Sequence, residues 1–472
     1  MSAWAAIILA AGASTRMRSR RPKVVHAVCG LPMIAHVTAA ARQAGIEHTI
    51  VVVGAQGGLV RDSLGEGHQY ATQPNPRGTA DAVAAARSHV EGRAAHLLVL
   101  NGDLPLVRPE TLDALMAAHR TSGAPMTILT CSERSVDLPG RVLRDAAGVV
   151  KDVIEAADLP EGGADHAEIN CGAYCFDAGW LWPSLSELRP GKRGEIYLTS
   201  LVGLAYRQGT PAASIEVADA TEALGVDTRV RLAQAEGAMR RRIRERWMLE
   251  GVTMVDPSST YIDAAASIGR DTVLHPNTFV LGDSIVGEEC EIGPGTVLTN
   301  ARIGSRCRIV ASMVEDSTLE PDVTVGPYSH LRGESHIESG ARLGNFVEIK
   351  KSRLGAGTRS HHFSYIGDAT VGKNVNIGAG TVTCNFDGVD KHPTIIEEEA
   401  FIGCDSMLVA PVRVGARART GAGAVVTKDV PPDTLVVGVP ARPLVKGGDS
   451  RVDGRQVRPG RSSDRRAVKG KG

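Results

Sequence analysis

The stretch "TVGPYSHLRGESHIESGARLGNFVEI", residues 324–349, has an aliphatic residue at every sixth position. These residues are Val325, Leu331, Ile337, Leu343 and Ile349, and a glycine follows the first and the fourth of them. A period of six fits neither an α-helix nor an ordinary strand, whose periods are about 3.6 and about 2 residues. It predicts a β-helix, in which each hexapeptide forms one side of a coil and buries one aliphatic residue.

The same register extends along the C-terminal half of the chain, from Ile268 to Leu298 and from Ile396 to Val414. We therefore predict a β-helix domain over residues 251–445. The segment "TCNFDGVDKHPT", residues 383–394, interrupts the register. We expect it to be a loop ejected from the coil, and binding residues tend to lie on such loops. Residues 446–472 are rich in arginine, glycine and serine, so we expect a disordered basic tail.

Residues 1–226 follow a different pattern. Aliphatic runs such as "AAIILAA", "HTIVVVGA" and "HLLVLNGD" alternate with stretches of helical spacing. They predict strands buried on both faces, hence a parallel sheet with helices on both sides, and ligands bind at the carboxyl ends of such strands. Residues 227–250 are highly charged and lack proline. We predict a linker helix there, with a basic face that is a solvated surface.

Composition excludes several classes of protein. A chain of 472 residues has room for two or three domains. Its 53 basic and 53 acidic residues argue against a general nucleic-acid binder. The eight cysteines form no C-x-x-C pair, so we expect reduced thiols in a cytoplasmic protein. The apolar run of residues 5–11 is short and precedes its positive charge, which argues against a membrane span and an export signal.

The segment "LAAGASTRMRSRRPK", residues 9–23, places a glycine turn after a buried strand. Such a turn lets backbone N–H groups bind a phosphate, although a purely structural turn would have the same sequence. Two carboxylates favour the phosphate site: Asp103 ends the strand "LVLNGD", and Asp227 follows the first domain. Magnesium is typically held by one or two carboxylates plus substrate phosphates. With Arg16 and Lys23, these groups suit transfer between phosphates.

Longer motifs add a family resemblance. "LAAGASTRM…RPKVVHAVCGLPM", "QPNPRGTADAV" and "NGDLPL" resemble the sugar-1-phosphate nucleotidyltransferases. With "GNFVEIKKSRLG", "SHHFSYIGDATVGKNVNIGAGTVTCNFDG" and "LVAPVRVG", the chain to about residue 445 resembles the bacterial bifunctional N-acetylglucosamine-1-phosphate uridyltransferase/glucosamine-1-phosphate acetyltransferases. This resemblance implies a Rossmann-like α/β nucleotidyltransferase domain followed by a left-handed parallel β-helix. It also implies a homotrimer with acetyltransferase sites between neighbouring β-helices.

The resemblance implies two reactions. The C-terminal domain would transfer an acetyl group from acetyl-CoA, a co-substrate, to glucosamine-1-phosphate. The N-terminal domain would then join N-acetylglucosamine-1-phosphate to UTP with Mg²⁺, releasing pyrophosphate. The product, UDP-N-acetylglucosamine, is a precursor of cell-envelope polymers such as peptidoglycan and lipopolysaccharide.

By position, the resemblance assigns roles in the N-terminal domain. Arg16 matches the catalytic arginine, and Asp103 and Asp227 match the magnesium pair, although most relatives have asparagine where Asp227 stands. The residues that read uracil are Gln73, Gly78 and Thr79. The other matches in the UTP and UDP-N-acetylglucosamine site are Leu9, Ala10, Ala11, Gly12, Lys23 and Gly102, with Gly140, Glu155 and Asn170 for the sugar.

In the C-terminal domain, His362 matches the general base, and Glu348 matches the carboxylate that orients it. The neighbouring His361 should be a bystander, because adjacent residues on a strand point to opposite sides. The sugar-phosphate site is matched by Arg332, Lys350, Tyr365 and Asn376, and the acetyl-CoA site by Ala379, Asn385, Phe386, Cys404 and Ala422. The 18-residue step from Arg332 to Lys350 is one coil if coils are three-sided, which places both cations on one face.

Several positions depart from the family, namely Ser14, Pro139, Ser200, Cys404 and Val439. Two other functions stay open on the sequence. One is a single-activity sugar-1-phosphate nucleotidyltransferase with a structural β-helix, against which the intact acetyltransferase residues argue. The other is a non-catalytic sugar-nucleotide sensor, against which the presence of Arg16 and Asp103 argues.

Overall fold

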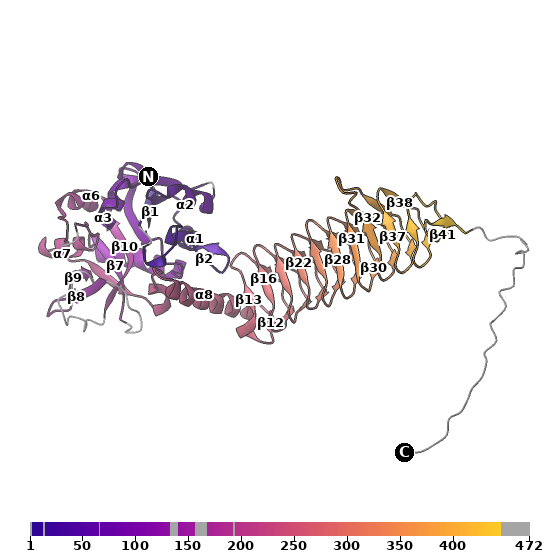
Figure 1. Ribbon diagram of the computed structural model, residues 1–472. Coiled ribbons are helices and arrows are strands. Elements are labelled where there is room, and N and C mark those ends of the chain that lie inside the picture. Colours follow the sequence, from indigo (N-terminus) through magenta and orange to yellow (C-terminus); the bar gives the residue numbers. More distant parts are fainter. Residues whose placement is uncertain are drawn as a thin grey trace, which may run out of the picture.

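The computed structural model describes residues 2–12, 15–65, 67–132, 140–155, 168–191 and 194–444. An N-terminal α/β domain is joined by a long helix to an elongated parallel β-helix (Figure 1). Ser14, Pro139 and the tail predicted for residues 446–472 lie outside the described residues.

The N-terminal domain is built on one sheet with the strand order β11-β7-β10-β6-β1-β4-β5. Its strands are β1 (Ser2–Ala10), β4 (Thr49–Val53), β5 (Gln69–Thr72), β6 (Ala94–Asn101), β7 (Met126–Cys131), β10 (Ile169–Asp177) and β11 (Ala213–Glu216), with the hairpin β8 (Gly140–Arg144) and β9 (Val150–Glu155) beside β10. Strands β6, β1, β4 and β5 are mutually parallel, as predicted. Their carboxyl ends form one edge of the sheet.

Strand β10 corrects the prediction of a wholly parallel sheet, because it runs antiparallel to both β6 and β7. Eight of its nine residues are buried, so its sequence looks like that of a parallel strand. A parallel connection needs a crossover of a dozen or more residues, usually a helix. Between β7 and β10 the described residues form only the β8–β9 hairpin, so the chain returns in the opposite direction.

Helices cover both faces of this sheet, as predicted. On one face lie α1 (Met33–Gln43), α2 (Gly57–Leu64) and α5 (Pro109–Ser122). On the other lie α3 (Thr79–Ala85), α4 (Arg87–Val90), α6 (Ala178–Glu187) and α7 (Ser200–Arg207). Each face has its own cluster of buried aliphatic side chains. In the described part of the chain, no helix is long and apolar enough to cross a membrane.

Helix α8 (Arg229–Leu249) connects the two domains. The prediction of a solvated basic face is only partly right, because Arg229 and Arg241 are exposed whereas other arginines contact the two domains. Arg242 donates to Asp219 Oδ2 (3.0 Å) and to Thr221 Oγ1 (2.8 Å) of the N-terminal domain. Arg240 lies over the ring of Tyr261 in the first coil, 4.2 Å from its centroid. The arginines therefore bind the helix to both domains.

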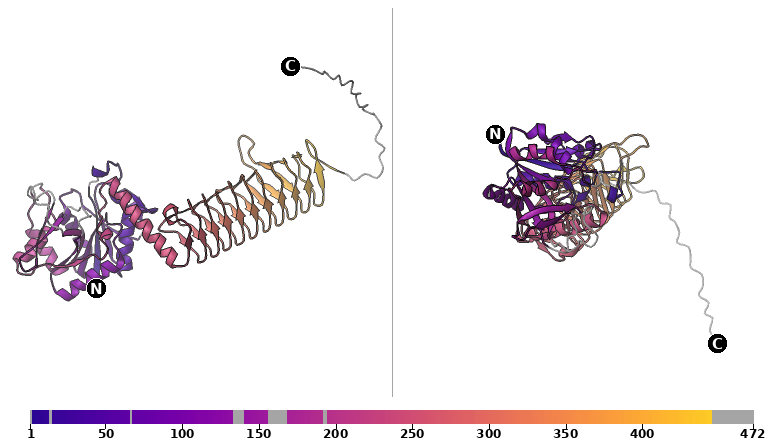
Figure 2. Two further views of the ribbon diagram at one scale, coloured as in Figure 1. Left: turned by 90° about the horizontal axis from the view of Figure 1, so that it is seen from below. Right: turned by 90° about the vertical axis from the view of Figure 1, so that its left-hand side faces the viewer.

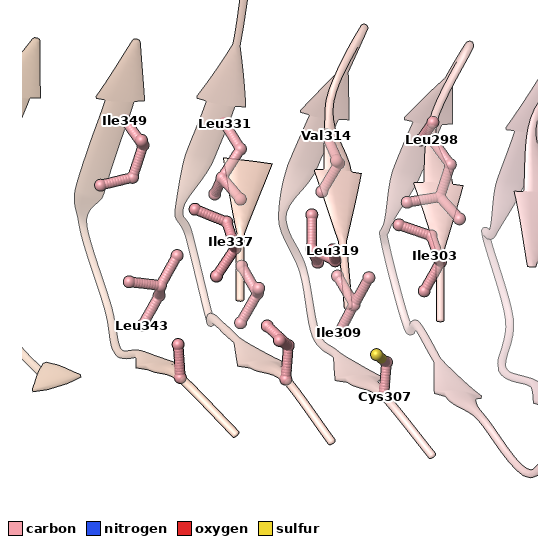
Figure 3. Close-up of a cluster of buried hydrophobic side chains, with 14 of the residues drawn as sticks. Leu298, Ile303, Cys307, Ile309, Val314, Leu319, Leu331, Ile337, Leu343 and Ile349 are labelled. Atoms are coloured by element: carbon pink, nitrogen blue, oxygen red, sulfur yellow. The ribbon is translucent and has the colours of Figure 1, made fainter. Parts of the chain in front are cut away.

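The β-helix consists of short strands between Thr253 and Pro443 that form three sheets of 12, 10 and 9 strands. The predicted sixth-position residues are buried inside it. Between Leu298 and Leu319 the register shortens, and Ile303, Ile309 and Val314 continue the series of inward side chains at steps of five or six residues (Figure 3). A coil that loses a residue at a corner keeps its inward side chains, so the fold tolerates the irregular period.

The interruption in the repeat is a projecting loop, as predicted. It connects β34 (Val382–Cys384) to β35 (Thr394–Ile396) and extends from the side of the β-helix (Figure 2). Its tip is ordered by Asp387, whose carboxylate accepts hydrogen bonds from Val389 N (2.8 Å) and interacts with His392 Nε2 at 2.7 Å.

Candidate functional site

The glycine turn after β1 and the end of β6 lie side by side at the edge where the parallel strands end. Gly102 N donates to the carbonyl oxygen of Leu9 (2.9 Å). A Cβ atom on Gly102 would lie only 2.8 Å from that oxygen, so this close approach requires glycine. The turn of residues 9–12 and the carboxylate of Asp103 are thereby fixed next to each other.

The two predicted metal carboxylates are also brought together. Val226 N donates to the carbonyl oxygen of Asp103 (3.0 Å), which places Asp227 beside it. Lys23 forms an ion pair with Asp103. Arg16 Nη1 lies 2.6 Å and Arg231 Nη1 3.3 Å from the same oxygen of Asp227, Oδ2.

The other oxygen of Asp227, Oδ1, is buried and accepts no hydrogen bond from any described residue. A buried, unsatisfied carboxylate oxygen fits a cation ligand. No group of three or more His, Cys, Asp or Glu side chains suited to a metal occurs in the described residues. The residues therefore fit Mg²⁺ held by two carboxylates and completed by substrate phosphates.

Many of the predicted site residues of the N-terminal domain line one of two cavities at this edge of the sheet. A cavity of about 220 Å³ is lined by Arg16, Lys23, Asp103 and Asp227 together with the predicted sugar residues Gly140, Glu155 and Asn170. A larger cavity of about 630 Å³ is lined by Ala10, Ala11, Gly12 and Gln73. The charged side chains among its described lining residues are Arg18, Arg20 and Arg21, which sequence reasoning missed although the run "RMRSRR" marks them.

Two of the predicted sugar residues are held by partners that the sequence did not indicate. Asn170 Nδ2 donates to the hydroxyl of Tyr174 (2.7 Å). Glu155 Oε1 accepts from Thr199 Oγ1 (2.8 Å). Glu155 and Thr199 are far apart in sequence, so no local motif connects them.

The predicted uracil readers lie together beyond β5. Gln73 is 4% exposed, and its Nε2 donates to the carbonyl oxygen of Gly78 (3.1 Å) and to Asp81 Oδ2 (2.7 Å). Thr79 Oγ1 accepts from Leu198 N (2.8 Å). Asp81 is a further residue of this site that the sequence did not single out.

On the β-helix, three adjacent strands carry most of the predicted sugar-phosphate residues: β25 (His330–Arg332), β28 (Val347–Lys350) and β31 (Ser364–Gly367). Arg332 pairs with Lys350 in register, which confirms that 18 residues make one coil here. Glu348 pairs with Tyr365. Lys391 of the projecting loop was missed: contact with the Lys350 ammonium lowers the pKa of Lys391. Two ammonium groups so close favour an anion between them.

The positions of the adjacent His361 and His362 differ from the prediction. His361 and His362 do not lie on a strand but at the corner between β30 (Arg359–Ser360) and β31, and both are exposed. The argument from opposite strand faces therefore does not apply to them. Their ring centroids are 6.5 Å apart. Burial, and then the nearby His362, Arg359 and Arg342, lower the pKa of His361.

Glu348 is bound to Arg332, whose Nη2 and Nε lie 2.6 and 3.0 Å from Glu348 Oε1. Within the described part of a single chain, no hydrogen bond joins Glu348 to His362. The role predicted for Glu348 in orienting the base stays a prediction.

The predicted acetyl-CoA residues fall on two edges of the β-helix. Ala379, Cys404 and Ala422 lie at successive corners of one edge, where Asp405 N donates to Ala379 O (2.6 Å) and Gly423 N to Cys404 O (2.8 Å). Asn385 and Phe386 begin the projecting loop instead. Asn376, on β33 (Asn376–Ile377), belongs to a different sheet from Arg332. One chain therefore distributes the predicted residues over separate surfaces.

The fold and these sites define a nucleotidyltransferase domain joined to a hexapeptide-repeat transferase domain. Three family models match in the same places: the MobA-like NTP transferase domain at residues 6–200, the bacterial transferase hexapeptide (six repeats) at 265–300, and the hexapeptide repeat of succinyl-transferase at 393–428.

Curated relatives named "Bifunctional protein GlmU" match nearly the whole chain. Those of Heliobacterium modesticaldum and Pelobacter propionicus are each 45% identical over 92% of this chain, covering 94% and 95% of the relative. That of a Geobacillus species is 43% identical over 92% of this chain and 94% of the relative. The chain belongs to the family of bifunctional GlmU proteins. This membership confirms the prediction of a bifunctional uridyltransferase and acetyltransferase.

Proposed function

We propose that the chain acetylates glucosamine-1-phosphate with acetyl-CoA and then transfers a uridylyl group from UTP to the resulting N-acetylglucosamine-1-phosphate. The observation that carries the second step is the pairing of Asp103 and Asp227 beside Arg16 and Lys23, with one buried carboxylate oxygen that has no hydrogen-bond partner among the described residues. We assign uridylyl transfer to residues 1–226, the linker to 227–250 and acetyl transfer to 251–445.

In the uridylyl step, a phosphate oxygen of N-acetylglucosamine-1-phosphate attacks the α-phosphorus of UTP, and the β- and γ-phosphates leave as pyrophosphate. The sugar phosphate lies in the smaller cavity against Asn170 and Glu155, and the nucleotide in the larger one against Gln73. Asp103 and Asp227 would hold Mg²⁺, which would supply positive charge to neutralise the phosphates. Arg16 and Lys23, now held by carboxylates, neutralise the charge that develops on the phosphates.

In the acetyl step, the amine of glucosamine-1-phosphate attacks the thioester carbonyl of acetyl-CoA and gives its proton to His362. The C–S bond then breaks, and coenzyme A leaves as a thiolate that takes the proton from His362. Arg332, Lys350 and Lys391 bind the sugar phosphate, since these cations converge beside the projecting loop. The coenzyme lies along the edge formed by Ala379, Cys404 and Ala422, with Asn385 and Phe386 against it.

We propose that this site is completed in a homotrimer. Support comes from the division of its residues between separate surfaces and from four exposed aromatic side chains near them, Tyr328, Phe346, Phe363 and Phe386, which are 57–63% exposed in a single chain. The rings of Tyr328 and Phe346 stack, with centroids 5.5 Å apart. Burial of such side chains between β-helices would favour association.

We also propose a cytoplasmic location, since all eight cysteines are free thiols and six of them are buried. There the chain would supply UDP-N-acetylglucosamine for cell-envelope polymers.

The test supplies purified full-length protein with glucosamine-1-phosphate, acetyl-CoA, UTP and magnesium, and follows coenzyme A and pyrophosphate separately. Release of both supports the proposal. Pyrophosphate release from supplied N-acetylglucosamine-1-phosphate without any coenzyme A release would instead identify a single-activity nucleotidyltransferase. Nucleotide binding with neither release would identify a sensor.

A further inference from the structure

Gln73 is a buried amide at the wall of the nucleotide cavity. It follows β5, and its backbone N donates to the carbonyl oxygen of Val53 (2.9 Å), which ties it to the neighbouring strand β4. Its side chain lines the cavity of about 630 Å³ together with Ala11 and Gly12. An amide presents a donor at one end and an acceptor at the other, so its orientation decides which base edge it can recognise.

The contacts of Gln73 fix that orientation. Its Nε2 donates to the carbonyl oxygen of Gly78 (3.1 Å) and to the carboxylate of Asp81 (2.7 Å). Both partners can only accept a hydrogen bond at neutral pH. A rotated amide would place Oε1 against two oxygens, which is repulsive. Of these two partners, only Asp81 has a side chain that a substitution can change.

The backbone turn that carries Asp81 is fixed by a neighbouring segment. It lies in the first turn of α3, where the helix dipole favours a negative charge. Gly78 precedes the helix with a φ of 112°, and a Cβ atom there would lie 2.4 Å from the carbonyl oxygen of Ile196. Ala80 N donates to the same oxygen (3.0 Å). The turn that carries Asp81 is thus packed against the segment before α7.

We propose that Asp81 sets the preference of this site for uracil over cytosine. By holding Nε2, Asp81 directs Oε1 of Gln73 as the acceptor for the N3–H of uracil. Cytosine has an unprotonated N3, which would meet Oε1 acceptor against acceptor. The inference rests on the proposed use of UTP and the proposed contact of Gln73 with the base. Asp81 acts through Gln73 and is therefore a positioning residue.

The decisive variant is Asp81→Asn, which keeps the size of the side chain but adds a donor. Its amide can donate to Oε1, so a rotated Gln73, with Nε2 facing the base, becomes accessible and can donate to N3 of cytosine. We expect the ratio of kcat/KM for UTP to that for CTP to fall by about tenfold or more. The ratio for UTP against 5-methyl-UTP, which has the same N3–H edge, should stay constant. Asp113→Asn, on the exposed surface of α5, is the matched control.

The alternatives give different results. A purely structural role for Asp81 would lower the use of all three nucleotides together, and this result, or an unchanged UTP:CTP ratio in folded Asp81→Asn, would overturn the inference. Thermal unfolding checks the fold of each variant. Titration calorimetry of UTP and CTP gives the same ratio without any reaction. Absence of pyrophosphate release by the wild-type protein would contradict the proposed function alone, since the binding ratio would still test Asp81.

Discussion

The substitution Asp103→Asn removes one of the two carboxylate charges from the proposed metal site and preserves the volume of the side chain. The Asp103 side chain is 13% exposed, so solvent screens it only in part. At a separation of about 4 Å and an effective dielectric constant of about 20, one pair of unit charges interacts by ~4 kcal/mol. Loss of that amount from the transition state corresponds to about 10³-fold in rate. We expect pyrophosphate release to fall by this order.

The same chain supplies the control, because coenzyme A release from acetyl-CoA and glucosamine-1-phosphate should stay at the wild-type rate. Asp227→Asn is the matched variant. The asparagine amide oxygen can take the place of Oδ1. The oxygen that is lost, Oδ2, already forms ion pairs with Arg16 and Arg231, which neutralise its charge. The rate of pyrophosphate release should therefore fall less in Asp227→Asn than in Asp103→Asn. A mild effect of Asp103→Asn, or equal loss of both activities in a folded protein, would refute the assignment.

Three further predictions follow from individual side chains. Gln73→Ala should weaken use of UTP by about 1–3 kcal/mol, because the uracil N3–H loses its acceptor; unchanged steady-state kinetics with varied UTP would contradict this. His362→Ala should slow coenzyme A release ~10²–10⁴-fold and His361→Ala far less, with pyrophosphate release unaffected in both; the reverse ranking would disprove the assignment. Burial, with a smaller contribution from His96, lowers the pKa of His119 to about 4. The folded pKa is thus below the pKa of about 6.5 in the unfolded chain. The contribution of His119 to the free energy of unfolding is therefore fully present above pH 6.5, and about 3 kcal/mol of it is lost as the pH falls to 4. Urea unfolding of wild type and His119→Gln between pH 7 and 4 tests this, and equal pH dependence would count against it.

The β-helix could be predicted from its period because most coil sides bury one aliphatic residue, whatever the outer residues are; Ser360, Thr383 and Thr420 are exceptions. Its local register could not be predicted between Leu298 and Leu319, since corners there lose a residue without changing which side chains point inward. The direction of strand β10 could not be predicted either, because a strand that is buried on both faces has the same composition whether it runs parallel or antiparallel. Arg240 and Arg242 of α8 show a third limit. A charged side chain is expected to be exposed, but contact with another domain can cover it.

The uridylyltransferase site could be predicted to the extent that it follows strand ends. The turn after β1 and Asp103 each come directly after a buried aliphatic run, and parallel strands bring their carboxyl ends to one edge. Asp81, Tyr174 and Thr199 were missed because the contacts that tie them to the predicted residues are made with other side chains. Such contacts depend on packing between distant segments, for which a single sequence carries no pattern.

The acetyltransferase residues show a different relation between sequence and site. Arg332 and Lys350 converge within one chain because one coil separates them. Asn376 lies on another sheet from Arg332, and His362 lies at the corner before β31. The family resemblance nevertheless predicts that all four belong to one site. These observations agree with the prediction if the surfaces of two copies of the chain meet. A neighbouring copy would then supply the site residues that one surface lacks. The uridylyltransferase site needs no such help, because its carboxylates, cations and cavities come from a single chain.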